Sequence, residues 1–219
     1  MPPIKRRYFL SVSAPVVIDS KGRRWTNELW AKDLALHLDY IADLTLGCPV
    51  EYREPHEQEL LIEKEPFDQV RFIYFPASKN HLQGIVNLWR FVPIIWRGVA
   101  SCEIVHTGFG GWPISEGWFA VPIGKMLGRF VIINVESSFW RTKSNASLQR
   151  RIRSRVIERV NRFCIKLADL RLFTSRAYAE ELLPGVDQRV YVVPATWVDN
   201  DTILNERKLE RAGLPKSGK

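Results

Sequence analysis

Phe130-Val131-Ile132-Ile133-Asn134-Val135, followed directly by Glu136, is the clearest buried strand in this sequence. Five of these six residues are β-branched or aromatic, and such side chains are enriched in strands. A nearly continuous apolar run of this kind is typical of a parallel strand that is covered on both faces. The stretch therefore predicts an α/β fold built on a parallel sheet.

Six further apolar runs predict strands on either side of this stretch, at 8–13, 44–50, 70–75, 103–106, 170–174 and 190–193. Helical patterns alternate with them, at 26–41, 80–98, 118–127, 147–168 and 178–183. Strands that alternate with helices pair in parallel through right-handed crossovers. We expect a single Rossmann-like α/β domain, an open and mostly parallel sheet of about seven strands with helices on both faces.

Three of the helical patterns carry specific expectations. Thr26 is the predicted N-cap of the first helix. Pro93 is expected to kink or interrupt the helix at 80–98. The helix at 147–168 is rich in arginine and is expected to turn one apolar stripe to the core, with the arginines as a solvated flank. That stripe consists of Leu148, Ile152, Val156, Val160, Phe163 and Leu167.

The length of 219 residues suits one well-buried domain, whereas two domains would each be cramped. Hydrophobic residues at 46% and charged residues at 26% match ordinary globular usage. We assign residues 1–199 to the domain and residues 200–219 to the start of an interdomain linker or a C-terminal tail.

The net charge of +8 favours an anionic partner, which could be nucleic acid, an acidic membrane surface or a phosphorylated small molecule. No recognition-helix motif, zinc-ligand spacing or base-stacking signature is present, so we do not expect nucleic-acid binding. No stretch approaches the roughly 18 to 20 apolar residues that span a bilayer, so membrane contact would be peripheral.

The cysteines predict a reducing compartment. Cys48, Cys102 and Cys164 are odd in number and widely spaced, which favours neither a disulfide framework nor a metal site. The basic and apolar segment at 1–18 resembles an export signal, but Pro15 cuts a short apolar run that suits a first strand better. We expect a cytoplasmic protein, with the inner face of the membrane as a peripheral location.

Three loops should gather at the carboxyl ends of the strands, where open α/β sheets bind ligands. The first contains Gly22, Arg23 and Arg24, a flexible glycine and two guanidiniums that suit a phosphate or diphosphate. A solvated basic turn is the alternative. The first strand and loop lack GxGxxG, which disfavours a nucleotide-dependent oxidoreductase.

The second loop follows the strand at 103–106 and is rich in glycine. Gly108, Gly110 and Gly111 would let the backbone approach a ligand closely, and His106 would act on a hydroxyl group. This loop is a poor dinucleotide fingerprint because Pro113 stands at the third glycine position. A structural hydrogen bond is the alternative role for His106.

The third loop follows the clearest strand. Glu136, Ser137, Trp140 and Arg141 provide a carboxylate, a hydroxyl, an aromatic plane and a guanidinium, a mixture that suits a sugar. The alternative is an ion pair between Glu136 and a neighbouring arginine beside a packed Trp140.

Several motifs together resemble the N-terminal domain of family 4 glycosyltransferases of the GT-B fold. They are Gly22-Arg23-Arg24, His106-Thr107-Gly108, Val135-Glu136-Ser137, Ala168-Asp169-Leu170 with Thr174-Ser175, and Val192-Val193-Pro194 with Val198-Asp199. The resemblance covers about residues 8–199, and the order of the motifs after Ala168 is its strongest part.

The resemblance implies an acceptor-binding half of a hexosyltransferase that uses a sugar nucleotide as donor, without a metal or another cofactor. It places His106 beside the reacting hydroxyl and Glu136 where it positions that group, as the catalytic residues. It assigns substrate binding to the three loops, through Gly22, Arg23, Arg24, Gly108, Gly110, Gly111, Ser137 and Arg141. The implied acceptor is a carbohydrate or a lipid-linked sugar, in polysaccharide biosynthesis.

In this family a second domain holds the donor nucleotide, and its motifs have no place in the twenty residues after Asp199. We therefore expect this chain to need a donor-domain polypeptide, and a truncated product, a split subunit and an inactive remnant all stay open. A noncatalytic membrane or interaction module with a basic surface is the competing function. It is favoured by the arginine-rich helix and by Trp89, Arg90, Trp96 and Arg97.

Overall fold

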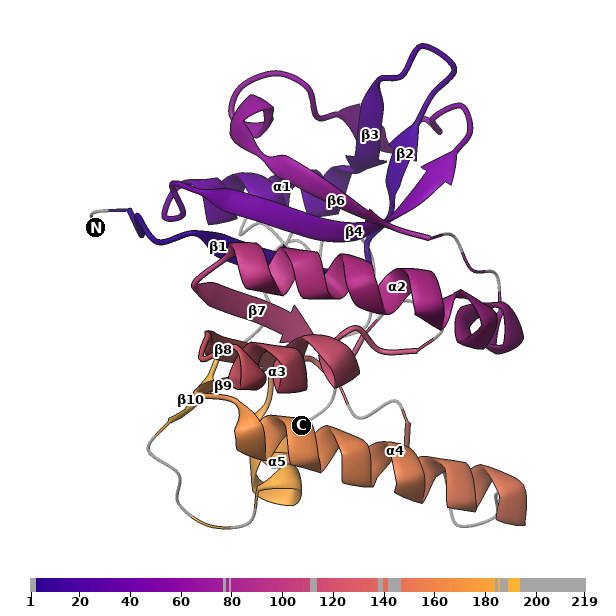
Figure 1. Cartoon of the computed structure of the whole chain (residues 1–219), viewed down its shortest axis with the longest axis vertical. Coiled ribbons are helices and arrows are strands. Elements are labelled where there is room, and N and C mark those ends of the chain that lie inside the picture. Colours follow the sequence, from indigo (N-terminus) through magenta and orange to yellow (C-terminus); the bar gives the residue numbers. More distant parts are fainter. Residues whose placement is uncertain are drawn as a thin grey trace, which may run out of the picture.

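A computed structural model describes residues 3–76, 78, 80–110, 114–137, 140–141, 147–183, 185 and 189–193. Within these residues, ten strands and five α-helices form an α/β domain with one mixed, mostly parallel open sheet (Figure 1). The predicted α/β class is confirmed. The predicted tail at 200–219, and residues 194–199 of the predicted domain, lie outside the described residues.

All seven predicted strands are present and form the parallel part of the sheet. Their bounds are β1 Tyr8–Ser11, β4 Leu44–Tyr52, β6 Arg71–Phe75, β7 Ile104–Gly108, β8 Phe130–Val135, β9 Leu170–Phe173 and β10 Val190–Val192. They lie in the order β6-β4-β1-β7-β8-β9-β10, and every neighbouring pair is parallel. The chain therefore builds outward from β1 in one direction and then from β7 in the other.

Three short strands were not predicted: β2 Val16–Ile18, β3 Arg24–Asn27 and β5 Glu59–Leu61. β2 pairs in parallel with the end of β4, while β3 runs antiparallel to both β2 and β5. The basic glycine loop is therefore the turn of a β-hairpin, and the prediction that it leads from a strand into a helix is wrong. Gly22 has a φ of +78° in this turn, a conformation that glycine adopts without strain.

The helices are α1 Glu28–Leu38, α2 His81–Ser101, α3 Gly117–Met126, α4 Leu148–Leu167 and α5 Arg176–Leu182, with a short 3₁₀ turn at Phe67–Gln69. Asn27 caps α1 by accepting a hydrogen bond from the backbone N–H of Leu29 at 3.0 Å. The predicted cap, Thr26, is instead buried in β3, where its hydroxyl donates to the carbonyl oxygen of Pro15. α2 continues through Pro93, so the helix is not interrupted there.

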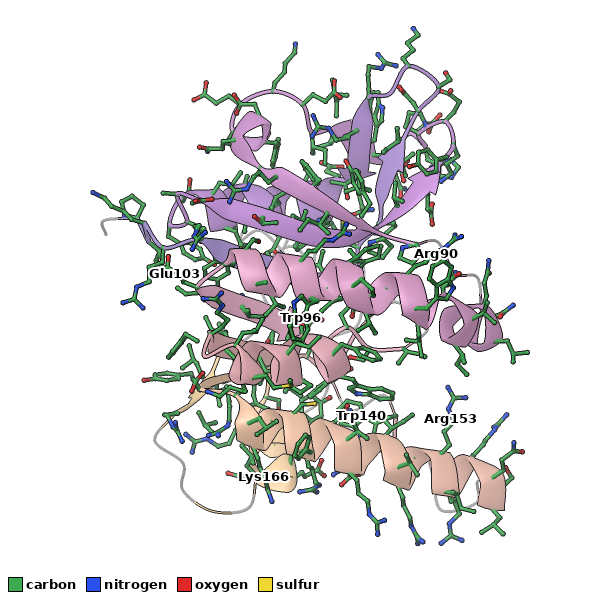
Figure 2. All side chains as sticks on the ribbon, viewed as in Figure 1. Arg90, Trp96, Glu103, Trp140, Arg153 and Lys166 are labelled. Carbon is green, nitrogen blue, oxygen red and sulfur yellow. The ribbon has the colours of Figure 1, made fainter. Side chains whose placement is uncertain are left out.

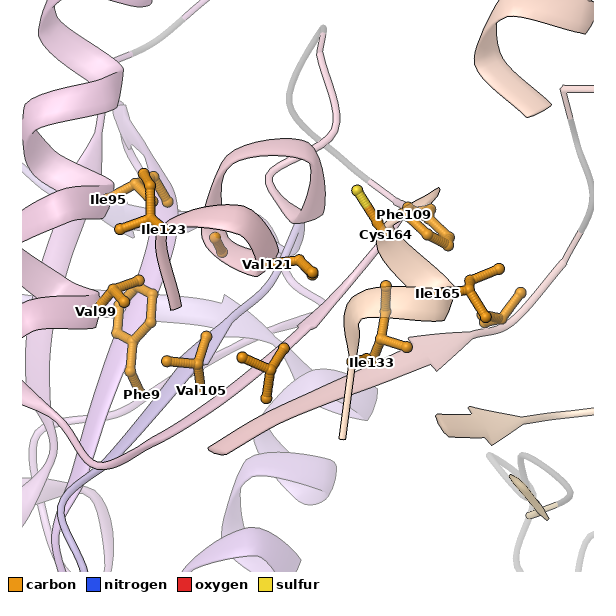
Figure 3. Close-up of a cluster of buried hydrophobic side chains, with 14 of the residues drawn as sticks. Phe9, Ile95, Val99, Val105, Phe109, Val121, Ile123, Ile133, Cys164 and Ile165 are labelled. Atoms are coloured by element: carbon orange, nitrogen blue, oxygen red, sulfur yellow. The ribbon is translucent and has the colours of Figure 1, made fainter. Parts of the chain in front are cut away.

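Helices cover both faces of the sheet, as predicted. Tyr8 and Leu10 of β1 pack towards α1, in one hydrophobic cluster with Leu34. Phe9, on the opposite side of the same strand, packs in a second cluster with side chains of α2, α3, α4 and α5 (Figure 3). This alternation follows from the two-residue period of a strand.

α4 turns a different side to the core from the one predicted. Leu148, Ile152, Val156 and Phe163 are all more than half exposed, so the predicted apolar stripe faces outward, although Val160 and Leu167 are partly buried. The buried side carries Ser154, Asn161, Cys164 and Ile165. These mostly small side chains allow close packing, and the indole N–H of Trp118 in α3 donates to Asn161 Oδ1 at 2.6 Å.

The described helices include none that is both long enough and apolar enough to cross a bilayer. The three cysteines are buried and unpaired with one another.

Candidate functional site

The strand order creates a switch point between β1 and β7, where the chain changes the direction in which it adds strands. Open α/β sheets bind ligands beyond the carboxyl ends of the strands at such a point. The two strands are tied together there by a buried hydrogen bond of 2.8 Å between the Ser11 and Thr107 hydroxyls. Beyond it, a Cβ on Gly110 would lie 3.4 Å from Ser13 Oγ, so the loops after β1 and β7 are in contact.

His106 lies on β7 at this switch point and belongs to the α1 side of the sheet. Its Nδ1 atom is 3.0 Å from the Tyr8 hydroxyl on β1, and the two rings meet edge to face. Burial, with a smaller effect from His37, lowers the pKa of His106 to about 3. Burial and Tyr40 raise the pKa of Tyr8 above its usual value. Both groups are therefore neutral at neutral pH, and His106 is available to exchange hydrogen bonds without carrying charge.

α1 adds a second histidine and a carboxylate that the sequence interpretation missed. His37 Nδ1 lies 2.8 Å from the backbone carbonyl oxygen of Asp33. A carbonyl only accepts, so Nδ1 carries a proton. The centres of the His37 and His106 rings are 6.3 Å apart. The available signal was the four-residue spacing of Asp33 and His37, which puts both on one side of a helix.

Glu136 comes into the same neighbourhood from the end of β8. Asn134 donates to its carboxylate at 3.1 Å, and the Thr174 hydroxyl donates to its backbone carbonyl at 2.7 Å. The residue reaches solvent, yet the protein atoms around its carboxyl group raise the pKa, and the negative charge of Asp33 raises it further. Burial also raises the pKa of Asp33, against the opposing effect of His37.

We call Tyr8, Asp33, His37, His106 and Glu136 the His-carboxylate cluster. Tyr8 and His37 lie beside His106, whereas Glu136 is linked to this group through the negative charge of Asp33, which stands four residues before His37 on α1. Neutral imidazole and carboxylate groups of raised pKa can accept and return hydroxyl protons. Within the described residues, no group of three or more histidine, cysteine or acidic side chains is arranged to hold a metal ion.

The two arginines of the first loop lie in the β2–β3 hairpin, which β1 and β4 separate from β7 in the sheet. Arg23 Nε donates to Asp19 at 2.7 Å, and the guanidinium stacks on Trp25. Burial alone would raise the pKa of Asp19, but hydrogen bonds from Arg23, Trp25 and Lys21 outweigh it and lower that pKa to about 2. Asp19 therefore organises the turn as a permanent anion.

Arg24 also makes its described contacts within this part of the sheet. Its backbone N–H donates to Glu63 Oε1 at 3.2 Å, and its guanidinium stacks on the ring of Phe72. A crevice shared by Arg23, His106 and Glu136 stays a prediction, and the described contacts of Arg23 stay inside the hairpin. The prediction that His106 ends its strand is wrong, because β7 continues to Gly108 and His106 pairs with Ile132, four residues before Glu136. Phosphate binding by Gly22, Arg23 and Arg24 stays a prediction.

The glycines of the second loop shape the end of β7. The Ser115 hydroxyl donates to the carbonyl oxygen of Gly108 at 3.3 Å, and a side chain on Gly117 would collide with that same oxygen. The start of α3 is thereby packed directly against the strand end, beside Gly110. Gly111 lies outside the described residues.

The described residues of the third loop lie in two places, Ser137 next to Glu136 of the cluster and Trp140 and Arg141 near the helices. Ser137 is half-buried next to Glu136. Trp140 is buried against Phe109, as the structural alternative predicted. Arg141 pairs with Glu158 of α4 at 3.2 Å and with Glu181 of α5, rather than with Glu136. Its described contacts anchor the loop to α4 and α5, and a role in substrate binding stays a prediction.

No protein-family model and no curated protein sequence matches this chain.

Proposed function

We propose that the chain is the acceptor-binding half of a glycosyltransferase, a Rossmann-like domain that presents a carbohydrate or lipid-linked acceptor for transfer of a hexose from a sugar nucleotide. One observation carries the proposal. α1 connects the two residues that the family resemblance singles out, because His37 lies beside His106 and the charge of Asp33 acts on Glu136. The sugar nucleotide would be held by a second, donor-binding domain.

The cluster supports this function through its hydrogen-bonding capacity. A sugar presents several hydroxyls, each of which donates one hydrogen bond and accepts others. The Glu136 and Asp33 carboxylates would accept hydrogen bonds from acceptor hydroxyls, while neutral His106 would exchange a hydrogen bond with the reacting hydroxyl. Ser13, Gly110 and Ser137 would line the approach of the acceptor.

The raised pKa of Glu136 also suits proton transfer. A carboxyl group whose pKa moves towards neutrality is a better match for a base working near pH 7. The protein atoms around the Glu136 carboxyl group raise its pKa most, and the negative charge of Asp33 adds to the rise. His106, whose pKa is about 3, is a weak base, so it would position the hydroxyl by hydrogen bonding. The proton would then pass to Glu136 as the acceptor oxygen bonds to the hexose and the bond between the hexose and the phosphate of the donor breaks, releasing the nucleotide.

Binding of acceptors to the ¹⁵N-labelled protein tests the proposal by NMR. A panel of mono- and disaccharides and short-chain lipid-linked sugars should contain a ligand that shifts the amide signals of residues 13, 108, 110 and 136. His106→Ala and Glu136→Gln should each weaken that binding at least about fivefold, since each removes a hydrogen-bonding partner worth about 1 kcal/mol or more. Glu57→Gln, at an exposed position away from the cluster, is the matched control and should bind as the wild type does.

The proposal fails if no sugar in the panel binds. It also fails if the shifted signals map to another part of the domain, or if the His106 and Glu136 variants bind as well as the Glu57 variant.

A further inference from the structure

α2 carries two apolar stripes, and only one of them belongs to the core. Phe91, Ile95 and Val99 are fully buried against the sheet and α3. On the opposite side, Leu82, Ile85, Val86, Trp89 and Trp96 are 42% to 76% exposed. Their spacing of three, four and seven residues places them on one side of the helix. We call these five residues the α2 outer stripe.

α4 has a matching arrangement. Leu148, Ile152, Val156 and Phe163, the α4 outer stripe, recur at four and seven residues and point away from the buried side. Next to this stripe runs a line of exposed cations, Arg151, Arg155, Arg159 and Lys166. α4 as a whole has seven basic side chains and one acidic side chain, Glu158, so most of the chain's excess positive charge is concentrated on it.

The two outer stripes belong to the same face of the molecule. α2 and α4 cover the same side of the sheet and contribute to the same core cluster, with α3 packed between them. Both helices therefore turn their outer sides away from the same side of the sheet. Figure 2 shows Arg90 of α2 and Arg153 of α4 towards the same end of this helical layer. Arg90 lies over the ring of Trp89, 4.7 Å from its centre, so cation and indole are together on α2 as well.

We propose that this face docks the protein on an anionic lipid surface, with the α2 and α4 outer stripes in the headgroup region and the arginines on lipid phosphates. Helices that lie in a membrane interface combine an apolar side, aromatic anchors and flanking Lys and Arg residues. Each Lys or Arg near an anionic leaflet adds attraction. The proposal does not rest on the glycosyltransferase function, because it involves the helical layer and not the switch point.

The composition of the face favours lipid over the other anionic or apolar partners. The two stripes contain nine exposed apolar side chains. These would contribute nothing to the binding of a nucleic-acid phosphate backbone, which is bound by charge. A second copy of this chain would bring the α4 cations against their own equivalents, and like charges opposed across an interface are unfavourable. A lipid surface complements both the apolar and the cationic side chains.

Vesicle co-sedimentation tests the proposal, with phosphatidylcholine vesicles that contain about 30% phosphatidylglycerol and with pure phosphatidylcholine vesicles. We expect partition onto the anionic vesicles at physiological salt and little onto the neutral ones. Arg155→Glu/Arg159→Glu should weaken partition by about tenfold or more, since each reversal replaces an attraction to the anionic leaflet with a repulsion. Lys5→Glu/Lys64→Glu makes the same change in net charge at exposed sites outside α2 and α4 and should stay within about twofold of wild type.

The apolar part of the proposal has its own variants. Ile152→Ser/Val156→Ser and Trp89→Ser should each reduce the binding that remains at high salt, because only lipid-inserted side chains contribute once charges are screened. Circular dichroism should show all variants folded.

Three results would overturn the proposal. One is the absence of partition onto anionic vesicles, and another is equal binding of the two charge-reversal variants. The third is a dimer in solution that Ile152→Ser/Val156→Ser dissociates, which would make the face a protein interface. Retention of a DNA duplex that only the Arg155→Glu/Arg159→Glu variant loses, without vesicle binding, would assign the face to nucleic acid.

Discussion

His106 is neutral in the folded protein because burial and His37 lower its pKa to about 3, whereas a histidine in an unfolded chain titrates near 6.5. Between these two pH values the unfolded chain binds the proton more readily. The stability contribution is therefore complete above about pH 6.5 and is lost as the pH falls towards 3. His106→Gln, which keeps a hydrogen-bonding partner for Tyr8, removes this dependence. The raised pKa values of Asp33 and Glu136 have the opposite effect on the pH dependence of stability. Both residues are present in wild type and in His106→Gln, so their effect is common to the two proteins.

Urea unfolding of wild type and His106→Gln at several pH values measures the effect. Below pH 6.5 the wild type should lose free energy of unfolding relative to the variant, by up to about 1.4 kcal/mol per pH unit, the limit for one proton. A difference that does not change between pH 7.5 and pH 5 would mean that His106 titrates normally and is not enclosed by Tyr8 and His37.

The residues of the candidate site were predictable where a strand end dictated their position. His106 and Glu136 were placed from apolar runs that do form the neighbouring parallel strands β7 and β8, although His106 lies inside β7 beside Ile132 and Glu136 follows the end of β8. The four-residue spacing of Asp33 and His37 puts both on one side of α1, but the sequence does not state which side α1 turns to the sheet, so their place beside His106 was not predictable from that signal alone. Arg23 was misplaced because β2 and β3 are too short to give a strand pattern, with only three and four residues.

At the scale of elements, α4 shows why the strongest apolar stripe need not be the buried one. Its outer stripe should contribute little to stability, because those side chains remain exposed in the folded chain. Ile152→Gln and Val156→Gln should each change the free energy of unfolding by no more than about 0.5 kcal/mol. Ile165→Ala, on the buried side, should cost about 2 to 5 kcal/mol. Chemical denaturation of the three variants decides between the orientations, and a large cost at Ile152 and Val156 would restore the orientation that the sequence pattern predicted.

At the scale of the whole molecule, one sheet separates two hydrophobic clusters, and both depend on it. The strand and helix alternation predicted the seven parallel strands, but not the hairpin strands attached at the end of β4, which extend the α1 side of the sheet. Because β1 contributes Phe9 to one cluster and Tyr8 and Leu10 to the other, neither cluster can form without the strands that support the other. The described part of the chain should therefore unfold as one cooperative unit.

Two conservative core variants test this cooperativity. Ile62→Val lies in the cluster on the α1 side, next to the hairpin strands, and Ile165→Val lies in the cluster on the opposite side. Each should lower the free energy of unfolding by about 0.5 to 1.5 kcal/mol. The double variant should show the sum to within about 0.5 kcal/mol, since the sites share no contacts across the sheet. Tryptophan fluorescence and far-ultraviolet circular dichroism should follow one transition in every variant. If Ile62→Val shifts an early, separate transition while Ile165→Val shifts only a later one, the hairpin side folds on its own and the two clusters are not coupled through the sheet.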